Sequence, residues 1–457
     1  MSAAKPGLYV FTRDLRLQDN RALNEALRKH HLVIPLFILD QRQGVVNDFF
    51  SSKAFSFMIE SLEALFGDIA AKGGVLNVIE GLSEEVLESI FMTYDIGGLF
   101  CQRDYTPFAR RREEKWEQLC RKHHIPFHGI HQSLLHVPGE VLTKAGSPFR
   151  IYSPFKRQAL ACEVPDAEKP VRGSYRKKPL KKSLLLKTLR EKKTETLNEG
   201  GRERGLEKLE NFLYSDNYSR FRDYPAQDAT SGLSPHVKFG TLSAREIWHE
   251  AQRSLREAEP FLSELLWRDF FGHIAFHFPR VFSGSFHEKY DSILWDEPGE
   301  KFLRWCRGET GLPMVDAGMR ELLQTGSMHN RVRMVAASFL VKDLHIHWRE
   351  GERHFARHLK DYDPASNNGN WQWAASTGCD SVPYFRVMSP WLQQKRFDPR
   401  GEYVKKWIPE LATVDPSLFF LPGKASRASA SAYPKPLVDH QKERIEALER
   451  YRRIPLI

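Results

Sequence analysis

Short apolar runs alternate with amphipathic stretches over residues 1–135 of the chain. The apolar runs predict strands over 8–11, 32–39, 75–79 and 98–101, and the i, i+3, i+4 spacing predicts helices over 52–72, 83–92 and 107–122. This alternation predicts an α/β domain with a parallel, Rossmann-like sheet. The turn after Phe11 carries no Gly-x-Gly-x-x-Gly motif, so a tight dinucleotide site is not expected there.

Residues 136–200 lose this alternation and are repeatedly interrupted by proline. We interpret them as a long inter-domain linker that runs over the surface. The linker contains a basic cluster, which we interpret as solvated; a nuclear address and a DNA contact are the alternatives. The cluster consists of Arg176, Lys177, Lys178, Lys181 and Lys182.

Residues 201–457 have a helical period almost throughout. Ser243 and Asp316 stand where N-caps belong, and Glu246 completes a capping box with Ser243. An all-α domain is therefore predicted over 201–457. Its helices are expected over 203–214, 243–257, 260–276, 300–307, 315–324, 328–344 and 349–360.

Composition narrows the class of protein. Of 457 residues, 41% are hydrophobic and 28% charged, a balance typical of folded domains, and the formal charge of +10 favours an anionic partner. No apolar run approaches the roughly 18 residues of a membrane span, and the N-terminus lacks a signal-peptide pattern. The five cysteines and 18 histidines show no CxxC or HExxH spacing, so neither disulfides nor a metal site is expected, and we interpret the histidines as surface or capping residues.

Tryptophan is concentrated in the second half of the chain, because only Trp116 of the 10 tryptophans precedes residue 240. We interpret most of them as core residues of the helical domain. The stretch 361–373 is unusual in combining two acids, three Asn within four positions, and two Trp. A polar turn into a helix is the simplest interpretation. Since buried amides need partners, a polar heterocyclic cofactor is the alternative.

Two further stretches bear charges on predicted helices. Arg331 and Arg333 fall on different faces of one helix, so one can pair with an acid such as Asp361 or Asp363 and the other can face an anion; two exposed arginines are the simplest interpretation. Residues 264–271 place Glu264, Trp267 and Arg268 together; Glu264 and Trp267 share a face, and an ordinary ion pair between Glu264 and Arg268 is the simplest interpretation. Residues 228–240 offer hydroxyls and backbone amides before a helix, a composition that suits phosphate but is common in loops.

The four stretches at 228–240, 264–271, 328–334 and 361–373 resemble the photolyase/cryptochrome family in their sequences and their order along the chain. The same is true of FTRDLRLQDN at 11–20, HWREGER at 347–353 and GCDSVPYFR at 378–386, so the resemblance spans nearly the whole chain. It is strongest to the class I cyclobutane pyrimidine dimer photolyases. The resemblance implies an α/β antenna domain and a helical domain that holds one U-shaped FAD. It also implies light-dependent DNA repair, in which reduced FAD transfers an electron to a flipped-out pyrimidine dimer and splits it into monomers.

The resemblance also implies which residues bind FAD. Asn367 resembles the residue that faces the reactive central ring nitrogen, and an amide can both donate and accept there. Aspartate at that position, as in plant cryptochromes, would favour a different redox state, so Asn367 indicates repair. The implied set is Tyr218, Thr230, Ser231, Gly232, Leu233, Ser234, Arg333, Asp361, Tyr362, Asp363 and Asn367.

Two other groups of residues take their roles from the resemblance. Trp371, Trp348 and Trp295 resemble the three-tryptophan chain that re-reduces photo-excited flavin. The pocket for the extruded dimer is implied to have Trp267 and Trp373 as apolar walls and Glu264 as a hydrogen-bonding group that stabilises developing charge. The full substrate set is Glu264, Trp267, Arg268, Asn330, Arg331, Met334 and Trp373.

Some positions depart from the family pattern. Phe108 and Ala109 stand where folate-binding members tend to carry Asn-Glu, so the folate motif is not intact and the type of any second antenna chromophore is left open. Cys379 stands where Thr is usual, and Thr12 where Arg is usual.

Three related classes are the alternatives to dimer repair. A cryptochrome, signalling through a partner, is disfavoured by Asn367, by the pocket residues and by the lack of a long tail after the last motif. Six-four photolyases use a His pair where this chain has His329-Asn330 and Met334, and DASH-type proteins usually lose one aromatic of the pocket, whereas Trp373 is present. We expect UV-damaged DNA as the partner, no obligatory protein partner, a monomer, and a cytoplasmic location in a bacterium or a nuclear or organellar one in a eukaryote.

Overall fold

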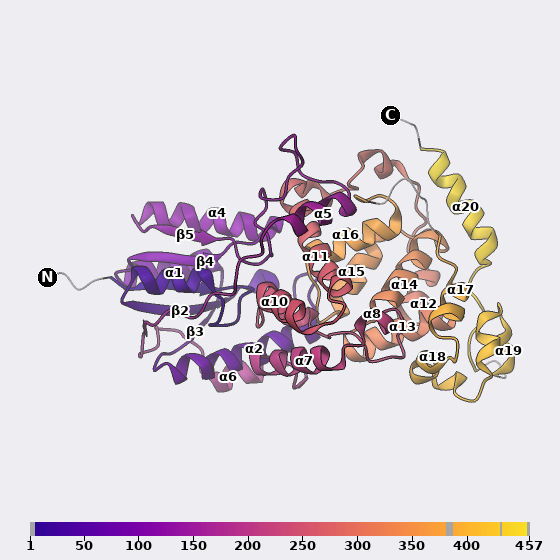
Figure 1. Cartoon of the computed structure of the whole chain (residues 1–457), viewed down its shortest axis with the longest axis horizontal. Helices are drawn as coiled ribbons and strands as arrows, with labels where there is room; N and C mark the ends of the chain where they lie inside the picture. Colours follow the sequence, from indigo (N-terminus) through magenta and orange to yellow (C-terminus); the bar gives the residue numbers. More distant parts are fainter. Residues whose placement is uncertain (1–4, 381–386, 430–431, 455–457) are drawn as a thin grey trace. The chain divides into compact units, whose positions relative to one another are not determined.

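The computed structural model, which describes residues 5–380, 387–429 and 432–454, has a parallel sheet near the N-terminus (Figure 1). The strand order is β3-β2-β1-β4-β5, and a short strand β6 also pairs with β2. Apolar side chains alternate between the two faces: Tyr9 and Phe11 enter one buried cluster, and Leu8 and Val10 enter another. The strands are β1 (Gly7–Phe11), β2 (Leu32–Leu39), β3 (Asn77–Glu80), β4 (Gly98–Gln102), β5 (Phe127–Ile130) and β6 (Ser174–Tyr175).

The chain divides into two compact units, one formed by residues 1–216 with 231–279 and the other by 217–230 with 280–457. The sequence-based boundaries at 135 and 200 stay a prediction. The first unit holds the sheet with helices α1 (Arg21–Lys29), α2 (Ser52–Ala71), α3 (Ser83–Thr93), α4 (Pro107–Lys122), α5 (Tyr152–Ala161), α6 (Leu186–Glu191), α7 (Arg202–Ser215), α9 (Ser234–Phe239), α10 (Ala244–Ser254) and α11 (Glu259–His277). The second holds α8 (Tyr218–Phe221), α12 (Glu300–Arg307), α13 (Pro313–Thr325), α14 (Asn330–Lys342), α15 (Trp348–His358), α16 (Pro364–Ala375), α17 (Pro390–Phe397), α18 (Glu402–Trp407), α19 (Lys424–Ala428) and α20 (His440–Arg452).

The predicted fold class, an α/β domain followed by a helical domain, is confirmed. Helix α1, strand β5 and the elements within 136–200 were not predicted from the sequence. That segment contains α5, β6 and α6, and the backbone N–H of Arg176 donates to the carbonyl of Val33 on β2 at 2.9 Å. The segment is therefore tied to the sheet and is not a bare connection, although proline interrupts it.

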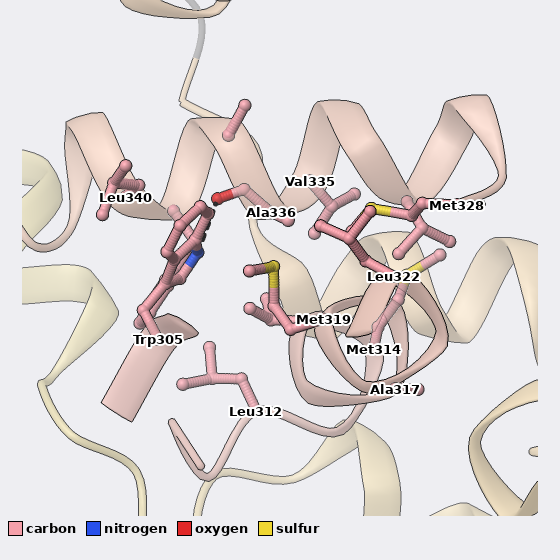
Figure 2. Close-up of a cluster of buried hydrophobic side chains, with 14 of the residues drawn as sticks. Trp305, Leu312, Met314, Ala317, Met319, Leu322, Met328, Val335, Ala336 and Leu340 are labelled. Atoms are coloured by element: carbon pink, nitrogen blue, oxygen red, sulfur yellow. Dashed lines mark hydrogen bonds between the residues drawn. The ribbon is translucent and has the colours of Figure 1, made fainter. Parts of the chain in front are cut away.

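The core of the second unit forms around α12, α13 and α14 (Figure 2). Trp305 is fully buried there, and its indole Nε1 donates to the carbonyl of Ala336 at 3.1 Å. Burying an indole with its N–H satisfied avoids a desolvation penalty. Trp305 is thus a core residue, as the sequence predicted, and Trp248, at 5% exposure, is equally a core residue of the first unit.

One predicted N-cap is confirmed and the other is wrong. Ser243 and Glu246 form the expected capping box on α10. Asp316 lies inside α13, after its first residue Pro313, and its carboxylate accepts the backbone N–H groups of Thr310 and Gly311. The carboxylate thus provides hydrogen-bond acceptors for backbone N–H groups of the loop before the helix, because the chain turns back toward the first helical turn.

Candidate functional site

The turn before α16 orders the polar residues at 361–370. Asp363 is the N-cap of α16, and its Oδ1 accepts the backbone N–H of Ser366 at 3.0 Å. Pro364 follows at the first helical position, where its missing N–H costs nothing. Asn367 lies one turn along, and its Nδ2 donates to the carbonyl of Glu352 at 3.1 Å. The predicted polar turn into a helix is confirmed.

Arg333 of α14 joins this turn through a two-pronged ion pair. Its Nη2 and Nη1 lie 2.9 and 3.3 Å from the carboxylate oxygens of Asp361, and its Nε donates to the carbonyl of Met328 at 2.7 Å. Three anchors fix the guanidinium plane. The pairing of one arginine with Asp361 is therefore confirmed.

Arg331 points elsewhere, as two positions on different helix faces must. Its Nη2 lies 2.6 Å from Asp223, and its guanidinium carbon lies 4.4 Å from the ring centroid of Phe397. The sequence predicted that one of the two arginines can face an anion. In the structure, Arg331 instead pairs with a carboxylate of the protein itself. The segment after α8 is thereby joined to α14.

The other substrate candidates on α14 lie at its beginning. Asn330 is its exposed first residue and Met334 is half-buried one turn on, so the two share a face. His329 is the N-cap: its Nδ1 accepts the backbone N–H of Arg331 at 3.1 Å, and burial lowers its pKa to about 4. A cap at this position agrees with the interpretation of the histidines as surface or capping residues.

A buried amide network lies behind the first turns of α16. Asn368 Nδ2 donates to Glu352 at 3.0 Å and to the carbonyl of Val281 at 3.1 Å, and Gln372 Nε2 donates to Asn368 Oδ1 at 3.0 Å. Burial raises the pKa of Glu352 to about 7. Partners for Asn368 therefore come from the protein itself, and the argument that these amides need a cofactor does not hold for this residue.

The three tryptophans of the implied electron path lie on or beside α15 and α16. Trp371 and Trp348 are 2% and 1% exposed, and Trp295 is half-buried. Gly351 lets α16 approach α15, because a Cβ at this position would lie 2.1 Å from Trp371 Cη2. Trp348 lies one turn before Gly351 on the same helix, so the buried ring of Trp371 lies against the helix that carries Trp348.

The imidazole of His347 lies beside both Trp348 and Trp295. The centroid of His347 lies 5.5 Å from that of Trp348 and 5.3 Å from that of Trp295. The rings thus run from a buried position on α16 to a half-buried one at Trp295. The sequence did not single out His347, which stands directly before the helix at Trp348.

In the first unit, α11 carries Trp267 in an aromatic stack. The Trp267 ring lies 3.6 Å from that of Tyr152, with 11° between the planes, and 5.5 Å from that of Phe271. Tyr152 was missed because its segment was taken as a linker; the apolar spacing of Tyr152, Phe155 and Ala159 is the signal that would have indicated α5. The stack fixes Trp267 in one orientation.

The neighbours of Trp267 on α11 are also anchored within this unit. Glu264 and Arg268 are both half-buried. Arg268 Nη1 donates to the carbonyl of Ser133 at 2.7 Å, a backbone partner that the sequence did not predict.

The remaining cofactor candidates are distributed over both units. Tyr218 and Thr230 belong to the second unit, and residues 231–234 to the first. Gly232 has a φ of +61°, a conformation that favours glycine, and the hydroxyl of Ser231 accepts the N–H of Leu233 at 3.4 Å. Ser234 begins α9.

Tyr362 and Trp373 are partly buried against the core of the second unit. Of the motif at 378–386, the structure describes residues 378–380, and residues 381–386 lie outside the described residues. Cys379 is buried.

Two features are absent from the described residues. No cluster of three or more His, Cys, Asp or Glu side chains within 5–380, 387–429 and 432–454 could hold a metal ion. Over the same residues, no helix combines the length and apolarity that crossing a membrane requires.

Comparisons with known proteins agree over both halves of the chain. Residues 7–172 match the DNA photolyase family, and residues 261–453 match the FAD binding domain of DNA photolyase. The deoxyribodipyrimidine photo-lyase of Agrobacterium fabrum is 34% identical over 98% of this chain and 97% of its own.

Solved structures give the same result. The archaeal photolyase of Sulfolobus tokodaii, described with two FAD molecules, is 39% identical with a TM-score of 0.89, over 98% of this chain and 99% of its own. A class III photolyase of Agrobacterium tumefaciens is 33% identical with a TM-score of 0.90, over 99% and 98% of the two chains. Since a class III enzyme is so similar, class I stays a prediction.

Proposed function

The chain belongs to the DNA photolyase family, and on that premise we propose how its own residues carry out repair. It is a FAD-dependent deoxyribodipyrimidine photo-lyase, which uses light to split pyrimidine dimers in UV-damaged DNA. The observation that carries the residue assignment is the cluster of Arg333, Asp361, Asp363 and Asn367, held by anchored contacts at the start of α16.

The donor set of this cluster fits a flavin. When bound, reduced FAD absorbs light and supplies the electron that splits the dimer. Arg333, Asp361, Tyr362 and Asp363 would hold the flavin ring, and Asn367, whose amide orientation is set by the Glu352 carbonyl, would be the group next to its central nitrogen. The residues that would bind the phosphates and ribitol are Tyr218 and Thr230 of the second unit and Ser231, Gly232, Leu233 and Ser234 of the first.

We assign apolar contacts with the extruded dimer to residues of each unit separately. In the first unit the residue is Trp267 of α11, which is stacked on Tyr152; in the second unit the residues are Met334 of α14 and Trp373 of α16. Glu264 hydrogen-bonds a pyrimidine carbonyl or imide, where charge develops during splitting. Asn330, Arg331 and Arg268 contribute polar contacts to the damaged strand.

Trp371, Trp348 and Trp295 would re-reduce a bound, oxidised flavin. Trp371 would give up the first electron and regain one from Trp348, Trp348 would regain one from the half-buried Trp295, and a small thiol in solution would reduce Trp295. The burial of the first two rings and the partial exposure of the third support this direction.

The decisive experiment mixes reduced, FAD-loaded protein with an oligonucleotide that contains a single thymine dimer, in light and in the dark. Loss of the dimer only in light is expected. If the dimer persists in light while the flavin still photoreduces, the protein is a photoreceptor of cryptochrome type instead.

The assembly and location belong to the same proposal. The protein acts as a monomer without an obligatory protein partner, in the cytoplasm of a bacterium or the nucleus or an organelle of a eukaryote. A second chromophore of other than folate type is supported by the Sulfolobus tokodaii structure with two FAD molecules. Pigment released by denaturation identifies it.

A further inference from the structure

His347 lies beside two rings of the electron path. It directly precedes Trp348, and its centroid lies 5.5 Å from that ring and 5.3 Å from the ring of Trp295. The ring planes are inclined by 32° and 58°. One imidazole is therefore a direct neighbour of both the second and the third tryptophan.

The orientation of this imidazole is fixed by a second function. His347 is the N-cap of α15, and its Nδ1 accepts the backbone N–H of Arg349 at 3.1 Å. An accepting Nδ1 carries no proton, so the capped ring is neutral. One helix terminus thus sets both the position and the protonation state of the ring.

The charges around the ring agree with a neutral imidazole. Burial, helped by Arg349 and Arg353 of α15 and opposed by Glu350 of α15 and Asp291 of the 3₁₀ turn Glu288–Ser292, lowers the pKa of His347 to about 4. Protonation would break the cap and place a positive charge beside the two tryptophans.

We propose that His347 is a positioning residue of the electron path, which holds Trp348 and Trp295 at a fixed separation and keeps the space beside them uncharged. This rests on the proposed role of the three tryptophans. One electron passes from Trp295 to oxidised Trp348, and a small thiol in solution later supplies one electron to Trp295. His347 forms and breaks no bond.

The geometry also predicts which step a charge would oppose. Because His347 is almost equally far from both rings, a positive charge there would make Trp348 and Trp295 harder to oxidise by similar amounts. Transfer between the two would change little. The step that would fail is electron transfer from Trp348 to oxidised Trp371.

Two substitutions separate positioning from capping. His347→Asn retains a capping oxygen but removes the ring, and His347→Phe retains a ring but removes the cap. His329→Asn is the matched control, because His329 caps α14 in the same way. Full-length protein with oxidised FAD is excited by a laser flash, and the yield of oxidised Trp295 is followed by transient absorption, together with the unfolding temperature.

We expect His347→Asn to lower this yield several-fold with little change in unfolding temperature, and His329→Asn to leave the yield unchanged. The wild-type yield should fall as the pH approaches about 4. His347→Phe should keep the yield, lose its pH dependence and unfold at a lower temperature.

A wild-type yield in His347→Asn, with Trp295→Phe slowing photoreduction, would overturn the role of His347 alone. If Trp295→Phe also left photoreduction unchanged, the tryptophan path itself would be wrong. Loss of repair by chemically pre-reduced His347→Asn would likewise overturn the proposal, since a residue of this path has no part in splitting the dimer.

Discussion

The amide of Asn367 has its orientation set by one contact, since only its NH₂ group can donate to the Glu352 carbonyl. Its oxygen therefore has a defined direction, which a side chain free to flip would lack. The charged group of Arg333 is fixed in the same way. Two hydrogen bonds to Asp361 and one to the Met328 carbonyl hold its guanidinium in one orientation. At residue scale, the site is made of groups whose orientation is fixed before any ligand binds.

Replacing Asn367 by Asp should weaken the fully reduced flavin. A carboxylate cannot donate to the Glu352 carbonyl, and it adds negative charge beside a ring that becomes more electron-rich on reduction. The midpoint potential for full reduction, measured by spectroelectrochemistry, is expected to fall. Asn370→Asp is the control, because Asn370 is exposed and bonds only locally to Ser366. An unchanged potential in Asn367→Asp would contradict the assigned role.

Replacing Trp295 by Phe should slow photoreduction but spare repair by chemically pre-reduced enzyme. Phenylalanine is far harder to oxidise than tryptophan, whereas dimer splitting needs no electron from this ring. Photoreduction rate and repair yield are measured on the same preparation. Trp407→Phe, also partly buried against the same core, controls for lost packing. Equal loss of both activities in Trp295→Phe would exclude the path.

Helices α15 and α16 form the element on which the site depends. Gly351 permits their close approach, Glu352 and Asn368 join them by a buried hydrogen bond, and Asn367 donates across the same interface. Because Asn367 and the first two tryptophans of the proposed path all lie on this pair, a change in its packing should affect photoreduction and stability together.

The substitution Gly351→Ala tests that packing. The new Cβ would lie 2.1 Å from Trp371 Cη2, so the ring or the helix must shift. We expect a loss of about 1–3 kcal/mol in stability and slower photoreduction. Gly67→Ala on α2 meets no atom within 4 Å and should stabilise by about 0.5–1 kcal/mol. Chemical denaturation measures both; equal effects would contradict the close approach.

The buried Glu352 should make stability depend on pH. Its pKa rises from 4.5 to about 7 in the fold, so the native state binds the proton more tightly than the unfolded chain. Its contribution is fully present below about pH 4.5 and is lost as the pH rises through about 7, a difference of up to about 3 kcal/mol. Glu352→Gln, which can still accept from Asn368, should stabilise the protein at alkaline pH and flatten this dependence. Unfolding temperatures across that pH window are the measurement.

At the scale of the molecule, charge and damage recognition contribute separately to DNA binding. The net charge of +10 attracts the phosphate backbone, whereas dimer extrusion and the proposed stacking on Trp267 involve no net charge. The basic cluster 176–182 belongs to a segment tied to the sheet by hydrogen bonds, and a DNA contact there stays one of its alternatives.

Affinity for DNA should therefore fall with salt, linearly on logarithmic axes. The ratio of affinities for dimer-containing and undamaged oligonucleotides should change far less than either affinity. Fluorescence anisotropy at a series of salt concentrations measures both. Affinity independent of salt would show that phosphate contacts do not contribute.

By itself, the sequence determined the parallel sheet, most helices, the pairing of one of two arginines with an acid and the residue types of the site, because periodicity and helix spacing are local properties. Only the tertiary structure decided that the pair is Arg333 with Asp361, that Asn368 is satisfied by Glu352, that Tyr152 of a supposed linker stacks on Trp267, and that His347 lies beside two tryptophans. Each of these depends on the close approach of elements far apart in the chain or on the direction of a capping side chain. Local spacing specifies neither, since packing of the whole unit fixes both.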